Sequence, residues 1–216
     1  MNSNSKIVFD PDVVDQIAQR HLGKPMAEMA EAIGRDLQDR YPDYVDVTMP
    51  LVFNSSGSIM YQLKIFAMTP HEYIMICGSS IGSSGFSGRH PAAFWDTVLS
   101  GQATYMHQDE WEARSYKTGE RIFVNRWESA SIDFPDHCWM LEYARGSLVW
   151  LLPFGMVNIF TNTLDFYSLL RLIRIYLTLT SKYFRKNQMA LRPYLIVSSA
   201  LLAAFWWLIS NRKGYR

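Results

Sequence analysis

The sequence has almost no excess of either charge, and it has few cysteines. Lysine and arginine number 21 against 20 acidic residues, so the 216-residue chain has a formal net charge of +1. This balance, with no zinc-finger spacing and no aromatic and basic RNA motif, argues against nucleic acid as a partner. The only two cysteines, Cys77 and Cys138, each lie in an apolar run. They indicate buried thiols in a reduced compartment, although the two could pair if their strands were neighbours.

A targeting leader is also lacking at the N-terminus, which has neither a signal-peptide core nor an arginine-rich transit pattern. The C-terminal end is different, because residues 193–210 form an uncharged apolar run of about 18 residues, long enough to cross most of a bilayer core. We predict a transmembrane anchor with a basic tail over residues 191–216, with a buried core helix as the alternative. Cationic residues on both flanks leave its orientation open.

Three common kinds of site are missing from the sequence. The first two, a serine nucleophile and a phosphate loop, would lie in the glycine-rich stretch at residues 78–90, and the third is a metal site. Its G-x-S-x-G match would make Ser80 a hydrolase nucleophile, but the three glycines that follow disfavour the helix that this elbow needs. No Gly-Lys-Ser/Thr follows for a phosphate loop, and Arg89 is the lone cation. The five histidines form no metal-ligand pair, so we predict no metal site. The stretch is interpreted as turns.

The residue pattern in the middle of the chain is typical of a β-sheet, and the patterns at both ends are typical of helices. Two helices are expected within residues 1–44, the first capped by Asp10 with Pro11 at its first position and the second stopped by Pro42. Short β-branched and aromatic runs separated by turn formers predict a sheet or barrel over residues 45–148. These runs are 49–53, 58–68, 73–77, 112–116, 121–124, 129–132 and 138–143, with residues 117–120 as a hairpin turn. Residues 90–101 are expected to form a short helix closed by Gly101.

Residues 149–190 are expected to be helical and amphipathic. One face carries Phe166, Leu169, Leu170, Ile173, Leu177 and Phe184, and another carries Arg171, Arg174, Lys182 and Arg185. A solvated surface helix is the plain interpretation. Because the apolar run at 193–210 follows, we favour a helix that rests on a membrane surface with its cations at the lipid headgroups.

Two acidic residues stand alone among large apolar neighbours. Asp96 lies in AAFWDTVLSG and Glu142 in CWMLEYARG, where ionisation is disfavoured unless the group is paired. A helix-surface acid and a water-facing strand acid are the plain interpretations, but strand alternation puts Glu142 on the same face as Met140. Two acids in one apolar pocket would separate their pKa values, giving a protonated donor and a carboxylate. Such a pair could protonate a carbon-carbon double bond or hold an ammonium group.

Four segments in order resemble one known family. HEYIMICGSSIGSSGFSGRH, FWDTVLSG, WMLEYARG and LPFGMVNIFTNTLDFY are similar to the fungal C-8 sterol isomerase and sigma-1 receptor family. The resemblance extends from about Ile7 to Arg185. It implies a mainly β fold, a cupin-like barrel flanked by N-terminal helices and by C-terminal helices on the endoplasmic reticulum membrane. It also implies a homo-oligomer, since the sigma receptor is a trimer.

The resemblance implies functional residues as well. The two family acids match Asp96 and Glu142, a ligand-pocket tyrosine matches Tyr73, and a pocket aromatic position matches Phe134. The implied reaction is cofactor-independent isomerisation of a Δ8 sterol to a Δ7 sterol, with Glu142 as the proton donor and Asp96 stabilising the carbocation, or with these roles exchanged.

A second function of the same family stays open. A receptor-like protein would bind sterols and cationic amphiphilic amines without turnover, whereas an isomerase would bind such amines as inhibitors. Family members commonly begin with a transmembrane segment; here the apolar run is at the other end, which leaves open on which side of the membrane the barrel lies.

Overall fold

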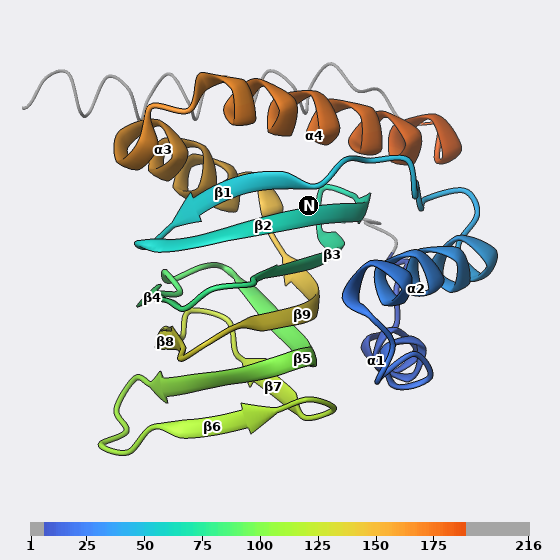
Figure 1. Ribbon diagram of the computed structural model, residues 1–216. Helices are drawn as coiled ribbons and strands as arrows, with labels where there is room; N and C mark the ends of the chain where they lie inside the picture. Colours follow the sequence, from blue (N-terminus) through green and yellow to red (C-terminus); the bar gives the residue numbers. More distant parts are fainter. Residues whose placement is uncertain (1–6, 189–216) are drawn as a thin grey trace, which may run out of the picture.

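The computed structural model describes residues 7–188 of the chain, which form a β-barrel with two helices before it and two after it (Figure 1). The helices are α1 (Pro11–Gln19), α2 (Met26–Arg40), α3 (Leu151–Thr163) and α4 (Phe166–Lys186), with a 3-10 turn at Leu148–Trp150 before α3. The strands are β1 (Val52–Ser56), β2 (Ile59–Met68), β3 (Glu72–Ser79), β4 (Ser83–Phe86), β5 (Ala92–His107), β6 (Arg114–Lys117), β7 (Arg121–Val124), β8 (Ala130–Phe134) and β9 (Cys138–Gly146).

The N-terminal helices begin and end where the sequence predicts. The Asp10 side chain caps α1 by accepting a hydrogen bond from the backbone N–H of Asp12, and Pro11 occupies the first turn, where its missing N–H costs nothing. The second helix, α2, ends at Arg40, two residues before Pro42. Both expectations are confirmed.

The antiparallel sheet follows the order β1-β2-β3-β9-β5-β8-β4 and then curls back on itself. Its last strand meets the β1–β2 turn, where the N–H of Phe86 donates to the carbonyl of Gly57 over 2.8 Å. Gly85 permits this approach, because a Cβ there would lie 2.2 Å from the Gly57 oxygen. The barrel is therefore nearly closed, as the run of short strands predicts.

The prediction of a short helix at residues 90–101 is wrong, because the segment from Ala92 onward belongs to the long strand β5. Its inward side chains face the barrel interior, while the outward Trp95 packs against Tyr143 and Phe123. With apolar residues on both faces, the period-two signal of a strand disappears. Gly101, at φ +80°, follows the bulge near Ser100 and does not cap a helix.

Two turn predictions also need correction. Gly78 and Ser79 of the glycine-rich stretch end β3, and residues 83–86 form β4, which pairs with β8, so only residues 80–82 and 87–90 lie outside strands. Residues 117–120 do form a turn, closed by a hydrogen bond from the Glu120 N–H to the Lys117 carbonyl. However, this turn makes no hairpin: β6 and β7 both pair with β5, one after the other along its length.

The barrel wall is apolar on both sides. Its inner side faces a cavity, and its outer side packs against α1 and α2, so every residue of β3 is buried. The two cysteines lie on the neighbouring strands β3 and β9, yet Cys77 pairs with Met140 and Cys138 pairs with Ser79, and both thiols are free. The cysteines are buried, as expected.

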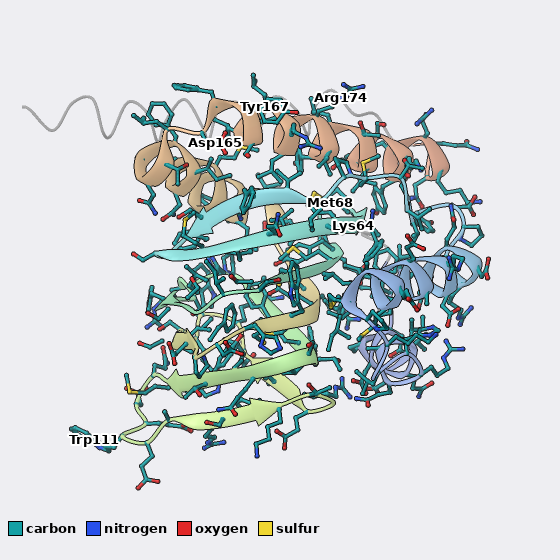
Figure 2. All side chains as sticks on the ribbon, viewed as in Figure 1. Lys64, Met68, Trp111, Asp165, Tyr167 and Arg174 are labelled. Atoms are coloured by element: carbon teal, nitrogen blue, oxygen red, sulfur yellow. The ribbon has the colours of Figure 1, made fainter. Side chains whose placement is uncertain are left out.

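The C-terminal helices α3 and α4 lie across β1 and β2 at the top of the barrel in Figure 1. Helix α4 turns Ile175, Tyr176, Leu179 and Tyr183 inward, while Tyr167 and Arg174 project away from the strands (Figure 2). Among residues 7–188, we find no helix that has both the length and the apolar character needed to cross a membrane. The transmembrane segment predicted within residues 191–216 lies outside the described part of the chain.

Candidate active site

A cavity of about 240 Å³ occupies the barrel interior beneath α3 and α4. On this measure a single water molecule needs only about 10–15 Å³, so the space is of ligand size. Inward side chains of every strand except β6 form its wall, and Leu151, Phe154, Leu172 and Tyr176 of the two helices cover it. Most of the lining is aliphatic, aromatic or methionine. This interior therefore suits an apolar molecule.

Two carboxyl groups meet on the cavity wall. Asp96 on β5 and Glu142 on β9 are directly opposite each other in the antiparallel ladder, so their side chains leave the same face of the sheet. The exposed fraction of Asp96 is 3%. The two carboxyl groups are close enough that the charge of Glu142 raises the pKa of Asp96, so the pair holds a proton more readily than an isolated carboxyl group. The pair is thus a proton-sharing dyad.

The two acids have unequal hydrogen-bond environments. Glu142 accepts from the Tyr73 hydroxyl through Oε1, and the Cys77 thiol faces its Oε2 at 3.9 Å. Asp96 accepts only a long bond of 3.4 Å, from the Tyr105 hydroxyl to its Oδ2. Its Oδ1 faces no donor within the described residues. Negative charge is therefore better stabilised on Glu142, and the proton is better placed on Asp96.

Burial sets the protonation of this dyad. It raises the pKa of Asp96 well above its ordinary value, and the charge of Glu142 raises it further. Burial also raises the pKa of Glu142, although hydrogen bonds from Tyr73, Asp96 and Cys77 work in the opposite direction. Two adjacent carboxylates in an apolar cavity repel each other, so the pair keeps a proton at neutral pH.

The cavity offers no cation to neutralise the remaining charge. Its described lining contains no lysine or arginine. The one histidine, His90, packs edge-on against Phe94 and Phe154, and burial lowers its pKa despite a hydrogen bond to the Ser87 carbonyl. The dyad is therefore a lone negative charge in an apolar space, which favours a ligand or intermediate that carries positive charge.

All four predicted site residues line this one cavity. Tyr73 contacts Glu142, whereas Phe134 on β8 lies elsewhere on the wall. Sequence reasoning missed Cys77 and Tyr105, which also contact the acids. Alternation from Tyr73 along β3 could have placed Cys77 inward, but finding Tyr105 requires knowledge of the bulge between it and Asp96.

The groups that sequence reasoning set aside have structural roles. The Ser80 hydroxyl accepts a hydrogen bond from the Trp139 indole N–H over 3.3 Å. The Arg89 guanidinium binds the Trp127 carbonyl, Gln108 and Ser129, which fastens the loop before β5.

Comparison with known proteins assigns this chain to a family. Residues 1–187 match the family described as "ERG2 and Sigma1 receptor like protein". The chain belongs to this family. Family members include the C-8 sterol isomerase ERG2 of Gibberella zeae, which is 31% identical over 171 residues covering 78% of this chain and 73% of that protein.

Other relatives in the family divide between two names. The C-8 sterol isomerase of Aspergillus fumigatus is 29% identical and covers 78% of this chain and 72% of its own. The sigma non-opioid intracellular receptor 1 of Danio rerio is 26% identical over 81% of this chain and 79% of its own. The family therefore includes both C-8 sterol isomerases and sigma receptors.

Solved structures with some likeness to the chain include cupin proteins. An RmlC-like cupin from Shewanella frigidimarina has 10% identity and a TM-score of 0.40, covering 46% of this chain and 85% of its own. A predicted oxalate decarboxylase from Thermotoga maritima has 15% identity and a TM-score of 0.41, over 47% of this chain and 97% of its own.

Proposed function

We propose that this protein is a sterol Δ8–Δ7 isomerase. The observation that carries the proposal is the proton-sharing pair of Asp96 and Glu142 on the wall of an apolar cavity. Membership of a family that contains C-8 sterol isomerases supports a sterol as the substrate. Moving a double bond along a ring requires one proton in and one proton out, so the reaction needs no redox cofactor.

The hydrogen-bond pattern favours the exchanged assignment of the two acids, with Asp96 as the proton donor. The proton of Asp96 adds to C9, the π electrons form the new C–H bond, and positive charge develops at C8. The Glu142 carboxylate stabilises this cation, since a charge in an apolar site acts far more strongly than in water. Glu142 then removes a proton from C7, and the C7–H electrons form the Δ7 double bond.

The reaction ends with the proton on the other acid. Asp96 is now the carboxylate and Glu142 carries the proton. Because the two side chains are direct neighbours on the same face of the sheet, transfer of one proton between them restores the starting state. The contacts of Tyr73 and Cys77 with Glu142, absent from Asp96, favour this return.

We further propose that the protein works at the endoplasmic reticulum membrane. Support comes from α4, where Phe166, Leu170 and Leu177 are exposed, with Leu170 at 66%, beside the cationic Arg174. An exposed apolar stripe flanked by cations is typical of a helix at a lipid surface. Such a position would let a lipid-dissolved sterol reach the cavity that α3 and α4 cover. A trimer or other homo-oligomer stays a prediction.

The test is expression of the full chain in a yeast strain that lacks its own sterol C-8 isomerase, followed by sterol analysis. We expect Δ8 sterols to disappear and Δ7 sterols to replace them. The Glu142→Gln variant, expressed to the same level, is the control and should leave the Δ8 sterols in place. Persistent Δ8 sterols with the wild-type chain present at the membrane would rule out the enzyme.

The alternative is a receptor-like protein that binds sterols and cationic amphiphilic amines at the same dyad without turnover. The similarity to sigma receptors over 81% of the chain supports it. Both functions predict tight binding of ammonium compounds, since an ammonium imitates the C8 cation. Turnover in the yeast strain distinguishes them.

A further inference from the structure

A second polar group lines the cavity at a distance from the dyad. Asn54 on β1 and Tyr61 on β2 are direct partners across the β1–β2 ladder, and both side chains line the cavity. Asn54 is only 8% exposed. Asparagine in a strand interior is unusual, and burying its amide is costly unless its atoms find partners.

One atom of this pair is left without such a partner. The Asn54 amide Nδ2 donates to the Tyr61 hydroxyl oxygen over 2.5 Å. The Asn54 carbonyl Oδ1 is buried and has no hydrogen-bond donor among residues 7–188. A buried acceptor left in this state costs free energy that a ligand donor inside the cavity would recover.

The neighbouring hydroxyl supplies the complementary group. The Tyr61 oxygen accepts a hydrogen bond from Asn54, and no hydrogen bond that its own hydroxyl donates is found within residues 7–188. Its own proton then remains to be donated. Tyr61 and Asn54 together therefore offer one donor and one acceptor to the cavity, and an alcohol is the group that matches both at once.

The position of this pair relative to the dyad limits the shape of the ligand. Glu142 pairs with Met75, which pairs with Ile65 on β2, four residues along from Tyr61. At about 3.3 Å per residue, the rows of the two polar groups lie about 13 Å apart along the strands. The charge of Glu142 nevertheless acts on Tyr61: together with burial, it raises the pKa of the Tyr61 hydroxyl. The ligand must be elongated, with its hydroxyl at one end.

We propose that Asn54 and Tyr61 bind the 3-hydroxyl of the sterol, holding the ring double bond against Asp96 and Glu142. This inference rests on the proposed sterol substrate. The alcohol donates its proton to Asn54 Oδ1 and accepts the Tyr61 proton. Such a contact makes Asn54 a specificity-determining residue, since an analogue without the hydroxyl leaves both groups unpaired.

The test compares three ligands that differ only at C3: cholest-8-en-3β-ol, the 3-ketone, which accepts but does not donate, and the 3-deoxy hydrocarbon. Dissociation constants are measured by calorimetry with the full chain in detergent micelles. The wild type should prefer the alcohol over the 3-deoxy compound by roughly 5- to 50-fold. The Asn54→Leu variant should bind the alcohol no better than the ketone. The Tyr61→Phe variant should weaken binding of the alcohol and the ketone and leave that of the 3-deoxy compound unchanged.

Gln62→Leu is the matched control, because Gln62 is next to Tyr61 in β2 and does not line the cavity. It should keep all wild-type ratios. The inference is overturned if the wild type binds the alcohol and the 3-deoxy compound equally, or if Asn54→Leu keeps the wild-type preference. If Asn54→Leu does not fold, Tyr61→Phe alone decides. The binding test and the yeast test can fail independently, because one measures ratios of dissociation constants and the other measures sterol conversion. A failed yeast assay would not contradict the role of Asn54 and Tyr61. Equal dissociation constants would not contradict the isomerase proposal.

Discussion

Asp96 and Glu142 are directly opposite each other in the β5–β9 ladder, and the charge of Glu142 raises the pKa of Asp96. Like charges in this arrangement are destabilising in a sheet, so the pair persists by keeping a proton. The cavity therefore holds a protonated acid beside a carboxylate, with the contacts of Tyr73 and Cys77 on Glu142 and only the long bond from Tyr105 on Asp96.

This asymmetry predicts that neutral replacements of the two acids have different effects on cation binding. Asp96→Asn removes the proton donor but leaves the Glu142 carboxylate, with its contacts to Tyr73 and Cys77, to hold an ammonium ligand. Glu142→Gln leaves Asp96, whose pKa burial keeps raised, so the site becomes neutral. We expect Glu142→Gln to weaken binding of a cationic amphiphile by roughly 30-fold or more.

The same pair of variants separates binding from turnover. Asp96→Asn should keep cation affinity within a few-fold of wild type and lower sterol conversion by about 100-fold or more, since a general acid contributes at least that much. Radioligand binding and sterol analysis measure the two effects on the same membranes. Equal loss of cation affinity in both variants would contradict the proposed location of the charge.

The raised pKa of Asp96 predicts how stability depends on pH. In the unfolded chain an aspartate loses its proton near pH 4, whereas in the folded protein Asp96 keeps its proton to a higher pH. At a pH between the unfolded and the folded pKa of Asp96, the folded state binds more protons than the unfolded state. Stability therefore falls as the pH rises from the lower pKa to the higher one, and it is highest below both. Asp96→Asn removes this penalty and should unfold a few degrees higher than wild type at pH 7.

The control for this prediction is the same comparison at pH 4, where both proteins have a neutral group at position 96. The difference between their unfolding temperatures should nearly vanish there. Thermal scans of both proteins from pH 4 to pH 8 measure the effect. An Asp96→Asn variant that is less stable than wild type at pH 7 would show that the carboxylate makes a stabilising contact instead.

The sequence is enough to predict a barrel with flanking helices, because the β-branched runs and their turn formers are local signals. It fails at Ala92–Ser100 and at Ser83–Phe86 for tertiary reasons. The first segment is apolar on both faces because α1 and α2 cover its outer side. The second contains Gly85, which must approach Gly57 closely, and closure of a barrel is a contact that local sequence does not encode.

The candidate site was predictable only in part for a similar reason. Asp96 and Glu142 stand out as acids among apolar residues, and the family resemblance points to Tyr73. Their pairing depends on the register between β5 and β9, which no local pattern fixes. Asn54 looks like a turn residue beside two serines, and only its register with Tyr61 shows that it lines the cavity.

A buried acid outside the cavity ties the N-terminal segment to the barrel. Glu72 is fully buried and accepts from the backbone N–H of Val8 over 2.7 Å and from the Tyr143 hydroxyl over 2.5 Å, with Arg145 Nε 3.7 Å away. Glu72→Gln keeps the shape of the side chain but removes the negative charge that these hydrogen-bond donors contact. We expect it to lower the free energy of unfolding by about 2–4 kcal/mol, as measured by urea denaturation.

Its control is Glu31→Gln, because Glu31 is an exposed acid whose ion pair with Arg35 spans 3.7 Å on α2. Loss of that pair should change stability by less than about 0.5 kcal/mol. The Glu72 variant should also become susceptible to protease near residues 7–10, since the held segment is released. If the two variants are equally stable, the Glu72 contacts do not hold the N-terminus.

Two ion pairs fasten the end of α4 that lies beyond the cavity. Lys182 Nζ is 2.6 Å from Asp46 Oδ2, and Lys186 Nζ is 2.5 Å from Asp43 Oδ2. Burial alone would raise the pKa of Asp46, but hydrogen bonds from Lys182 and Thr48, with the Lys182 charge, hold it below its ordinary value. The Lys182 pair is therefore the stronger of the two, since the Lys186 pair is half exposed.

Loss of the stronger pair should loosen the cover of the cavity, because α4 also carries the lining residues Leu172 and Tyr176. We expect Lys182→Met to speed ligand dissociation several-fold in stopped-flow measurements and to increase hydrogen exchange of the α4 amides, at a cost of about 1 kcal/mol in stability. Lys186→Met, the matched control on the same helix, should change both rates little. Since the Lys182 pair is partly buried, 0.5 M salt should reproduce little of its loss. Unchanged dissociation and exchange in Lys182→Met would mean that packing of Leu179 and Tyr183 alone holds α4 in place.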